Sequence, residues 1–186
     1  ILHQSPTRCV VEDYAHHPTE IRAFLSQRRM QLADHSLQVV FQPHRFSRTQ
    51  ALAERFAEEL SQADDLHLMP TYGAFENFDP AGSVETLMGY LPPRLRARTR
   101  IFSDFSELRA AIGPEPSMKA KDQVLFVGAG DLERWAHAFA AWEKSGGDKH
   151  MAFSSYLAPR LSGSTALLAD EPLASKTTIG VGGPSR

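Results

Sequence analysis

Five side chains that can bind ligands or transfer protons lie close together near the start of the chain: Glu12, Asp13, Tyr14, His16 and His17. They come directly after an apolar run, residues 9–11, and directly before a predicted helix. At such a strand-to-helix turn the side chains meet the free N–H groups of the helix start, which favours an anionic ligand. The residues alone leave an alternative open, in which Asp13 only satisfies donors of the turn and the histidines are surface residues.

A second group occupies the segment F-Q-P-H-R-F-S-R-T at residues 41–49. Arg45 and Arg48 are three residues apart, so they point the same way if the segment is already turning into a helix. Two such guanidinium groups form a clamp for a carboxylate or phosphate, and His44 supplies a further donor. The alternative is a loop whose arginines pair with surface acids. Because both groups follow predicted strands, we expect them to converge on one crevice.

A metal centre within the chain is not predicted. His16 and His17 are neighbours that cannot easily bind one ion together, and neither H-x-x-x-H nor paired-cysteine spacing occurs, which argues against structural zinc. Asp13 remains compatible with a magnesium ion shared with nucleotide phosphates. We interpret Gly128-Ala129-Gly130 as a tight turn. Since no G-x-x-x-x-G-K-[ST] motif is present, the main phosphate loop for any ATP is expected outside this sequence.

Apolar runs and helical periodicities alternate along most of the chain. Strands are predicted at 9–11, 37–41, 66–69, 100–102 and 123–127, and helices at 18–33, 49–62, 83–91, 104–112 and from the glycine turn to about 144. This alternation is typical of an α/β fold with a doubly wound, mostly parallel, Rossmann-like sheet flanked by helices. After residue 144 we expect an irregular C-terminal tail.

Composition excludes several classes of function. The 186 residues contain 20 Lys and Arg against 22 Asp and Glu, a formal net charge of −2. This balance gives no electrostatic basis for binding nucleic acid or an anionic membrane surface. No segment approaches the roughly 18 apolar residues of a spanning helix. The single cysteine, Cys9, excludes an internal disulfide and suits a reducing compartment, so a cytoplasmic location is expected.

Two other features receive simple interpretations. Arginine recurs with period two at residues 94–100, which we interpret as a solvated edge before a strand. The sequence begins without a methionine, so we expect it to be a piece of a longer protein.

Three motifs together carry a family resemblance: D-Y-A-H-H-P-T-E at 13–20, F-Q-P-H-R-F-S-R-T at 41–49 and V-G-A-G-D at 127–131. Over residues 8–144 the chain resembles the C-terminal domain of the Mur ligases, and among these the UDP-N-acetylmuramate:L-alanine ligases, the MurC type. It departs from their usual pattern at Glu12, where aspartate is usual. It also carries Tyr-Gly-Ala-Phe-Glu at 72–76 in place of Tyr-Ala-Ala-Gly-Glu.

The resemblance implies a ligase of peptidoglycan biosynthesis. In that family ATP, with Mg²⁺, phosphorylates the lactyl carboxylate of UDP-N-acetylmuramate, and the amine of L-alanine attacks the acyl phosphate. By motif position Asp13 and Tyr14 would touch ATP, and His16 would face the reacting phosphoryl or acyl group. The substrate carboxylate would be held by His44, Arg45 and Arg48. Residues 1–144 would be the amino-acid-binding lid, inactive without the N-terminal and central domains.

The tail carries a second, shorter resemblance. Residues 171–184 are similar to the start of the FAD domain of UDP-N-acetylenolpyruvoylglucosamine reductases, the MurB type. This predicts a linker at 145–168 and a stub of a flavin domain at 169–186, from a fusion of ligase and reductase. FAD would be bound only by the reductase part that this sequence lacks. The alternative function is a non-catalytic α/β module that tethers such a reductase.

Overall fold

The computed structural model describes residues 1–147. The elements follow in this order: β1 (His3–Gln4), β2 (Arg8–Asp13), α1 (Pro18–Gln31), β3 (Ser36–Gln42), α2 (Phe46–Leu60), β4 (Asp65–Leu68), the 3-10 helix η1 (Pro80–Gly82), α3 (Val84–Tyr90), α4 (Pro93–Arg96), β5 (Arg100–Ile101), α5 (Phe105–Ile112), β6 (Asp122–Gly128) and α6 (Leu132–Lys144). The predicted linker and flavin-domain stub fall almost wholly outside the described residues.

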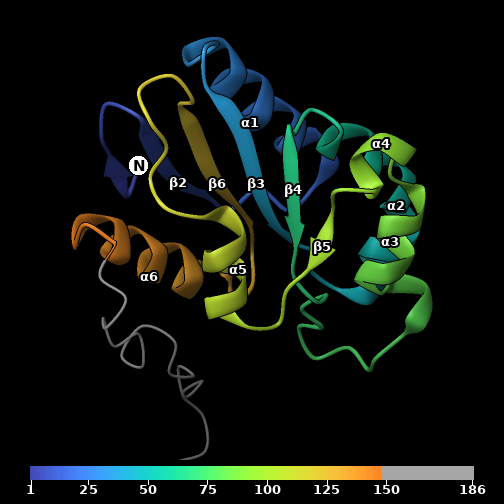
Figure 1. The fold of residues 1–186 in the computed structure, drawn as a ribbon. Coiled ribbons are helices and arrows are strands. Elements are labelled where there is room, and N and C mark those ends of the chain that lie inside the picture. The colour runs from blue at the N-terminus through green and yellow to red at the C-terminus, as the bar shows by residue number, and fades with distance from the viewer. Residues whose placement is uncertain (148–186) are drawn as a thin grey trace, which may run out of the picture.

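Six strands form one sheet in the order β1-β2-β6-β3-β4-β5 (Figure 1). All neighbouring pairs are parallel except β1, which runs antiparallel to β2. The last strand of the chain, β6, therefore lies between β2 and β3. Its register aligns Val127 with Asp13 and Gly128 with Gln42, so the ends of these three strands meet at one edge.

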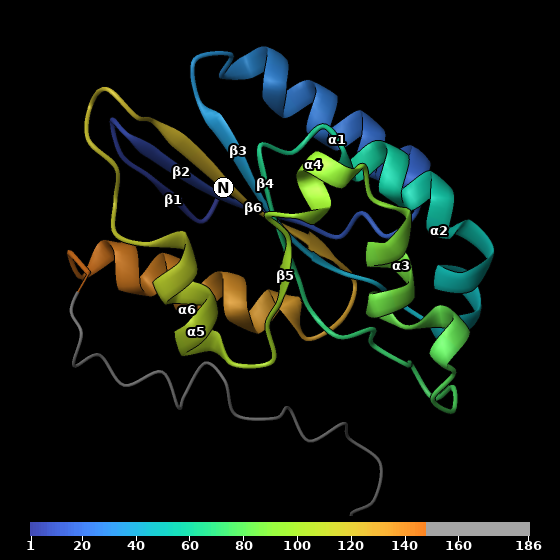
Figure 2. The same cartoon turned by 45° about the vertical axis from the view of Figure 1, so that its right-hand side comes forward.

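Helices cover both faces of the sheet, as Figure 2 shows, with α1 to α4 on one side and α5 and α6 on the other. Side chains alternate along the central strands: Phe41 and Val127 belong to the core under α1 and α2, whereas Val40 and Phe126 belong to the core under α5 and α6. All four are fully buried. A sheet covered on both faces produces such continuous apolar strands, and the predicted doubly wound fold is confirmed.

Local sequence explains where α1 begins. Pro18 occupies its first turn, where a missing N–H costs nothing. The side chain of His17 accepts from the backbone N–H of Thr19, and Glu20 completes a capping box by accepting from the N–H of His17. The helix ends at Gln31, two residues earlier than predicted.

Two predicted features need correction. Helix α2 begins at Phe46, three residues before the predicted start, so Arg48 lies inside its first turn. The arginine series at 94–100 is exposed as expected, but it does not form an extended edge. Pro93 starts the one-turn helix α4, which places Arg94 on a helix and leaves only two residues for β5.

Candidate active site

The two sequence groups meet at the carboxyl edge of the sheet. The ring centroids of His16 and His44 lie 5.9 Å apart. On one side, the ring of Tyr14 makes an edge contact with His16 at 5.2 Å, and on the other, the ring of Tyr72 stacks on His44 at 5.6 Å. Four rings thus form a continuous row across the ends of β2, β3 and β4. The expected convergence on one edge is present.

Within the first group, the simple structural alternative accounts for part of the sequence. Asp13 Oδ1 accepts from the N–H of Ala15 at 2.9 Å, which closes the turn after β2. His17 caps α1, and Glu20 Oε2 accepts from the backbone N–H groups of His16 and His17. These hydrogen bonds hold the pKa of Glu20 below its usual range. The turn is therefore rigidly built.

Tyr14 and His16 remain available for a ligand. The side chain of Tyr14 is 69% exposed. His16 Nδ1 lies 3.0 Å from the backbone carbonyl oxygen of Tyr14. Because a carbonyl only accepts, Nδ1 donates, and the neutral ring then has its lone pair on Nε2. His16 can therefore accept a proton at Nε2 without breaking this hydrogen bond.

Glu12 is directed away from this row of rings. Its Oε2 lies 3.5 Å from Nε2 of His137 on α6. Burial raises the pKa of the Glu12 carboxyl, while His137 acts in the opposite direction. The side chain therefore serves the contact between β2 and α6.

Two nitrogen atoms of the second group are buried without hydrogen-bond partners among residues 1–147: Nδ1 of His44 and Nη1 of Arg48. Burial lowers the pKa of His44, and the positive charge of Arg48 lowers it further, so the imidazole is neutral at pH 7. Buried polar atoms are nearly always paired in native proteins. Both atoms therefore lack the partner that buried polar atoms normally have, and both belong to the segment in which the sequence predicts a carboxylate clamp.

Arg45 differs from Arg48 because it has an acidic partner. Its Nε lies 3.2 Å from Oε1 of Glu76, and its side chain is 48% exposed. This ion pair is of the kind that the alternative to a clamp predicts, and it engages Arg45 through Nε. No role for Glu76 or Tyr72 follows from the sequence motifs. The position of Tyr72 shortly after the predicted strand 66–69 was a signal that could have identified it, whereas the contact of Glu76 with α2 leaves no local signal.

The glycine turn after β6 is a packing feature. A Cβ atom at Gly130 would lie 2.5 Å from Oε1 of Gln42 and 2.9 Å from Cβ of Tyr72. The same Gln42 oxygen accepts from the N–H of Leu132 at the start of α6. These short distances require glycine and confirm the predicted tight turn.

A cavity of about 370 Å³ opens beside this turn at the carboxyl edge. Its lining includes Tyr72, Phe102 and Trp135, together with an ion pair between Asp131 and Arg134. It shares Tyr72 with the row of rings, whereas His44, Arg45 and Arg48 do not line it. No three His, Cys, Asp or Glu side chains within residues 1–147 come together as a metal site.

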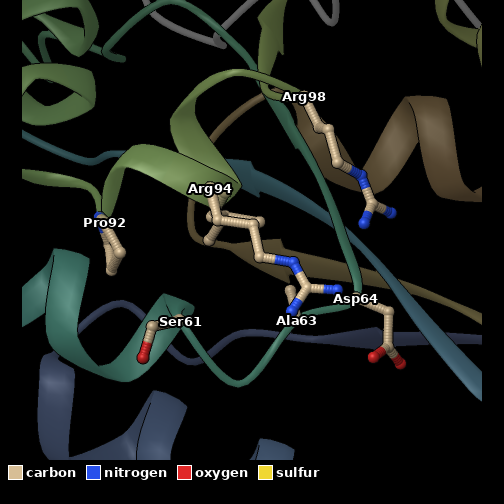
Figure 3. Close-up of a pocket in the computed structure, with 7 residues that line it drawn as sticks. Ser61, Ala63, Asp64, Pro92, Arg94 and Arg98 are labelled. Carbon is tan, nitrogen blue, oxygen red and sulfur yellow. The ribbon is translucent and has the colours of Figure 1, made fainter.

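A second cavity, of about 270 Å³, lies at the other end of the sheet, between α4 and the end of α2 (Figure 3). Arg94 and Arg98 line it together with Asp64. Asp64 is already engaged by Arg29, and Arg98 by Asp65. The predicted site residues line neither cavity, and the carboxyl edge is the candidate site because the two sequence groups meet there.

The fold, with chemistry-bearing turns at the carboxyl ends of its parallel strands, defines an α/β ligand-binding domain. Residues 1–130 match the family described as "Mur ligase, glutamate ligase domain". This match spans more than half of the sequence, and the chain belongs to the Mur ligase family. None of the helices within residues 1–147 has the length and apolar character that crossing a membrane requires.

The "UDP-N-acetylmuramate--L-alanine ligase" of Ligilactobacillus salivarius is 36% identical over 131 residues, which cover 70% of this chain and 27% of that protein. The enzyme of the same name from Desulfotalea psychrophila is 38% identical over 123 residues, 66% of this chain and 26% of that protein. The chain therefore spans about a quarter of the length of these curated relatives.

Solved structures agree with the fold. The crystal structure of UDP-N-acetylmuramate-alanine ligase MurC from Thermotoga maritima matches with a TM-score of 0.55 and 26% identity, over 77% of this chain and 28% of that one. A murein peptide ligase from Psychrobacter arcticus matches with a TM-score of 0.53 and 18% identity, over 80% of this chain and 30% of that one. The second likeness supports the architecture alone.

Proposed function

We propose that this chain is the amino-acid-binding domain of an ATP-dependent ligase that joins L-alanine to UDP-N-acetylmuramate through an acyl phosphate, in peptidoglycan biosynthesis. The observation that carries the proposal is the pair of buried, unpartnered atoms among the described residues, His44 Nδ1 and Arg48 Nη1. An α-carboxylate accepts from Arg48, and also from His44 when Nδ1 carries the proton. The relatives named as L-alanine ligases support this choice of substrate.

The first sequence group would serve the phosphoryl and acyl chemistry. Tyr14 offers an exposed ring to the nucleotide, and Asp13 lies in the same turn. His16 faces His44 and keeps a proton-accepting Nε2 on the side of the incoming amine. Mg²⁺ would arrive with the phosphates of ATP and neutralise their charge, because residues 1–147 do not form a metal centre by themselves.

Exposed aromatic side chains support the proposal that another protein domain covers this edge of the sheet. Tyr14 is 69% exposed, Phe78 is 73% exposed and Phe75 extends fully into solvent. These side chains belong to the turns that follow β2 and β4, and we propose that they dock against another domain of the ligase. Because the phosphate loop for ATP is expected elsewhere, we expect the isolated chain to be inactive and to act as a lid on the other ligase domains.

The domain limits at 1–144, 145–168 and 169–186 stay part of this proposal. The family match ends at residue 130, and the described residues end at 147. A fusion to a flavin-dependent reductase, with FAD in the reductase, therefore stays a prediction from residues 171–184 alone. The alternative function, a non-catalytic module that tethers a reductase, also stays a prediction. An upstream sequence without a phosphate loop would favour this alternative.

Arg48→Ala in the complete ligase tests the proposal. The substitution removes one donor of the carboxylate clamp, so the KM for L-alanine should rise about 10- to 100-fold, the equivalent of about 1.4–2.7 kcal/mol. The KM for ATP should stay within about twofold. Arg55→Ala, at an exposed position of the same helix, is the matched control. Equal increases in both KM values would contradict the clamp.

Calorimetry with ATP and this chain alone gives an independent check. Very weak binding is expected, because the main phosphate loop is assigned to another domain. Tight binding would favour a free-standing nucleotide-binding protein.

A further inference from the structure

The loop after β4 is built onto the segment that precedes α2. The backbone N–H of Tyr72 donates to the carbonyl of Pro43 at 2.8 Å, and the N–H of Arg45 donates to the carbonyl of Tyr72 at 2.7 Å. Together with the stacked rings of His44 and Tyr72, these bonds fix the loop to the candidate clamp. Glu76 follows four residues later in the same loop.

The carboxylate of Glu76 lies at the N-terminus of α2. Its Oε2 accepts from the backbone N–H of Ser47 at 3.0 Å, and its Oε1 accepts from the Ser47 hydroxyl at 2.6 Å. The N-cap residue of α2, Arg45, makes no capping bond with its own side chain. Glu76 therefore caps the helix from 29 residues away, where the positive end of the helix dipole favours a carboxylate.

The same carboxylate holds Arg45, whose backbone has an unusual conformation. Arg45 has φ 72° and ψ 126°, in a region that side-chain-bearing residues seldom occupy. Its carbonyl accepts from the N–H and the hydroxyl of Thr49, and its side chain meets Glu76 through Nε. Contacts on the amide, the carbonyl and the side chain thus fix this residue in one geometry.

One edge of the Arg45 guanidinium stays available. Nη1 and Nη2 make no hydrogen bond or ion pair to any side chain that the structure describes, whereas Nε is engaged by Glu76. Burial lowers the pKa of His44, and the positive charges of Arg48 and Arg45 add to this effect.

We propose that Glu76 is a positioning residue: by binding Nε of Arg45 beside the start of α2, it directs the free edge of Arg45 toward the amino-acid carboxylate. This inference rests on the proposed function. It gives a role to the loop at 72–76, in which the family pattern changes but the glutamate remains. Contact with the substrate stays with the two arginines and His44.

Steady-state kinetics of the complete ligase test this role. Glu76→Ala should raise the KM for L-alanine about tenfold while the KM for ATP stays within about twofold, because a charge-assisted bond to Arg45 is lost. Glu76→Gln keeps one acceptor oxygen, which can still cap the backbone N–H of Ser47, but it loses the charge and the second acceptor. It should therefore raise the KM for L-alanine while lowering the melting temperature less than Glu76→Ala does. Glu54→Gln, on the exposed face of α2, is the matched control.

A Ser47→Ala variant separates the contact with Arg45 from the hydroxyl bond to Ser47. It removes the hydroxyl bond to Glu76 but keeps the backbone N–H that Glu76 caps and the contact with Arg45, so the KM for L-alanine should change less than about twofold. An increase as large as that of Glu76→Ala would overturn the inference, since loss of the Ser47 hydroxyl bond would then explain the effect without Arg45.

A double-mutant cycle with Arg45→Ala distinguishes failure of this inference from failure of the proposed function. If Glu76 acts through Arg45, the double variant has the same KM for L-alanine as Arg45→Ala alone. If the increases in the KM for L-alanine caused by the two substitutions multiply, the inference is refuted, but the proposed carboxylate clamp is not. An unchanged KM for L-alanine in Arg45→Ala itself would refute the clamp at Arg45 and the inference with it.

Discussion

Replacing Arg8 with methionine removes the cation of a buried ion-pair network on the side of α6. The Arg8 side chain is 1% exposed, and it donates from Nε and Nη2 to Asp122 at 2.8 and 2.6 Å and from Nη1 to Glu143 at 2.5 Å. The two carboxylate side chains are only 4% and 3% exposed. Methionine fills similar space but leaves both of them without a counter-charge.

The cost follows from that burial. Removing one partner of a buried ion pair costs about 3–5 kcal/mol, which is a large share of the roughly 5–15 kcal/mol that stabilises a typical domain. Burial already raises the pKa of Glu143, against the influence of Arg8. Without Arg8 this pKa rises further, so the folded variant binds more protons than the unfolded chain as the pH falls. The loss of stability should therefore be smaller at the lower pH.

Urea denaturation of this chain at pH 7.5 and pH 5.5, followed by tryptophan fluorescence, measures both effects as differences from the unaltered protein. Arg22→Met, at an exposed position of α1, is the control and should change the free energy of unfolding by less than about 0.5 kcal/mol. A loss for Arg8→Met below about 1 kcal/mol at pH 7.5, or an equal loss at both pH values, would refute the reasoning.

Three further predictions concern stability. Burial lowers the pKa of His67 to about 4, whereas an unfolded histidine has a pKa of about 6.5. Between these two pH values the unfolded chain binds more protons than the folded one. The free energy of unfolding should therefore fall by up to about 3 kcal/mol as the pH drops through this window. His67→Phe should flatten this part of a stability-against-pH curve. Gly82→Ala brings a Cβ within 2.0 Å of the Phe46 carbonyl oxygen, so calorimetry should show a melting temperature several degrees lower. Gly89→Ala, at the exposed end of α3 with nothing within 4 Å of the added carbon, should instead add about 0.5–1 kcal/mol.

The sequence predicts the layers of this fold because each element carries its own signal. Pro18 and the periodic apolar residues after it indicate α1, and Ser83 and Asp104 cap α3 and α5 as expected. The position of β6 between β2 and β3 is different. Strand order depends on packing between elements that are far apart in the sequence, and local hydrophobic periodicity does not predict it.

The site was predicted in part for the same reason. The sequence motifs contain the polar and aromatic side chains of Tyr14, His16, His44 and Arg48. Because the strands are parallel, the turns that carry these residues meet at one edge of the sheet. The role of Glu76 could not be derived, because it depends on a contact 29 residues away. The early start of α2 has the same origin, since Glu76 supplies the cap that the local sequence lacks.

The central place of β6 has a consequence for synthesis on the ribosome. Until residue 128 has emerged, β2 and β3 have no shared neighbour, since both pair with this last strand. The two turns of the candidate site therefore stay apart in a nascent chain until residue 128 has emerged, and the apolar edges of both strands remain unpaired until then. We expect slow translation over this interval to favour chaperone capture of the nascent chain.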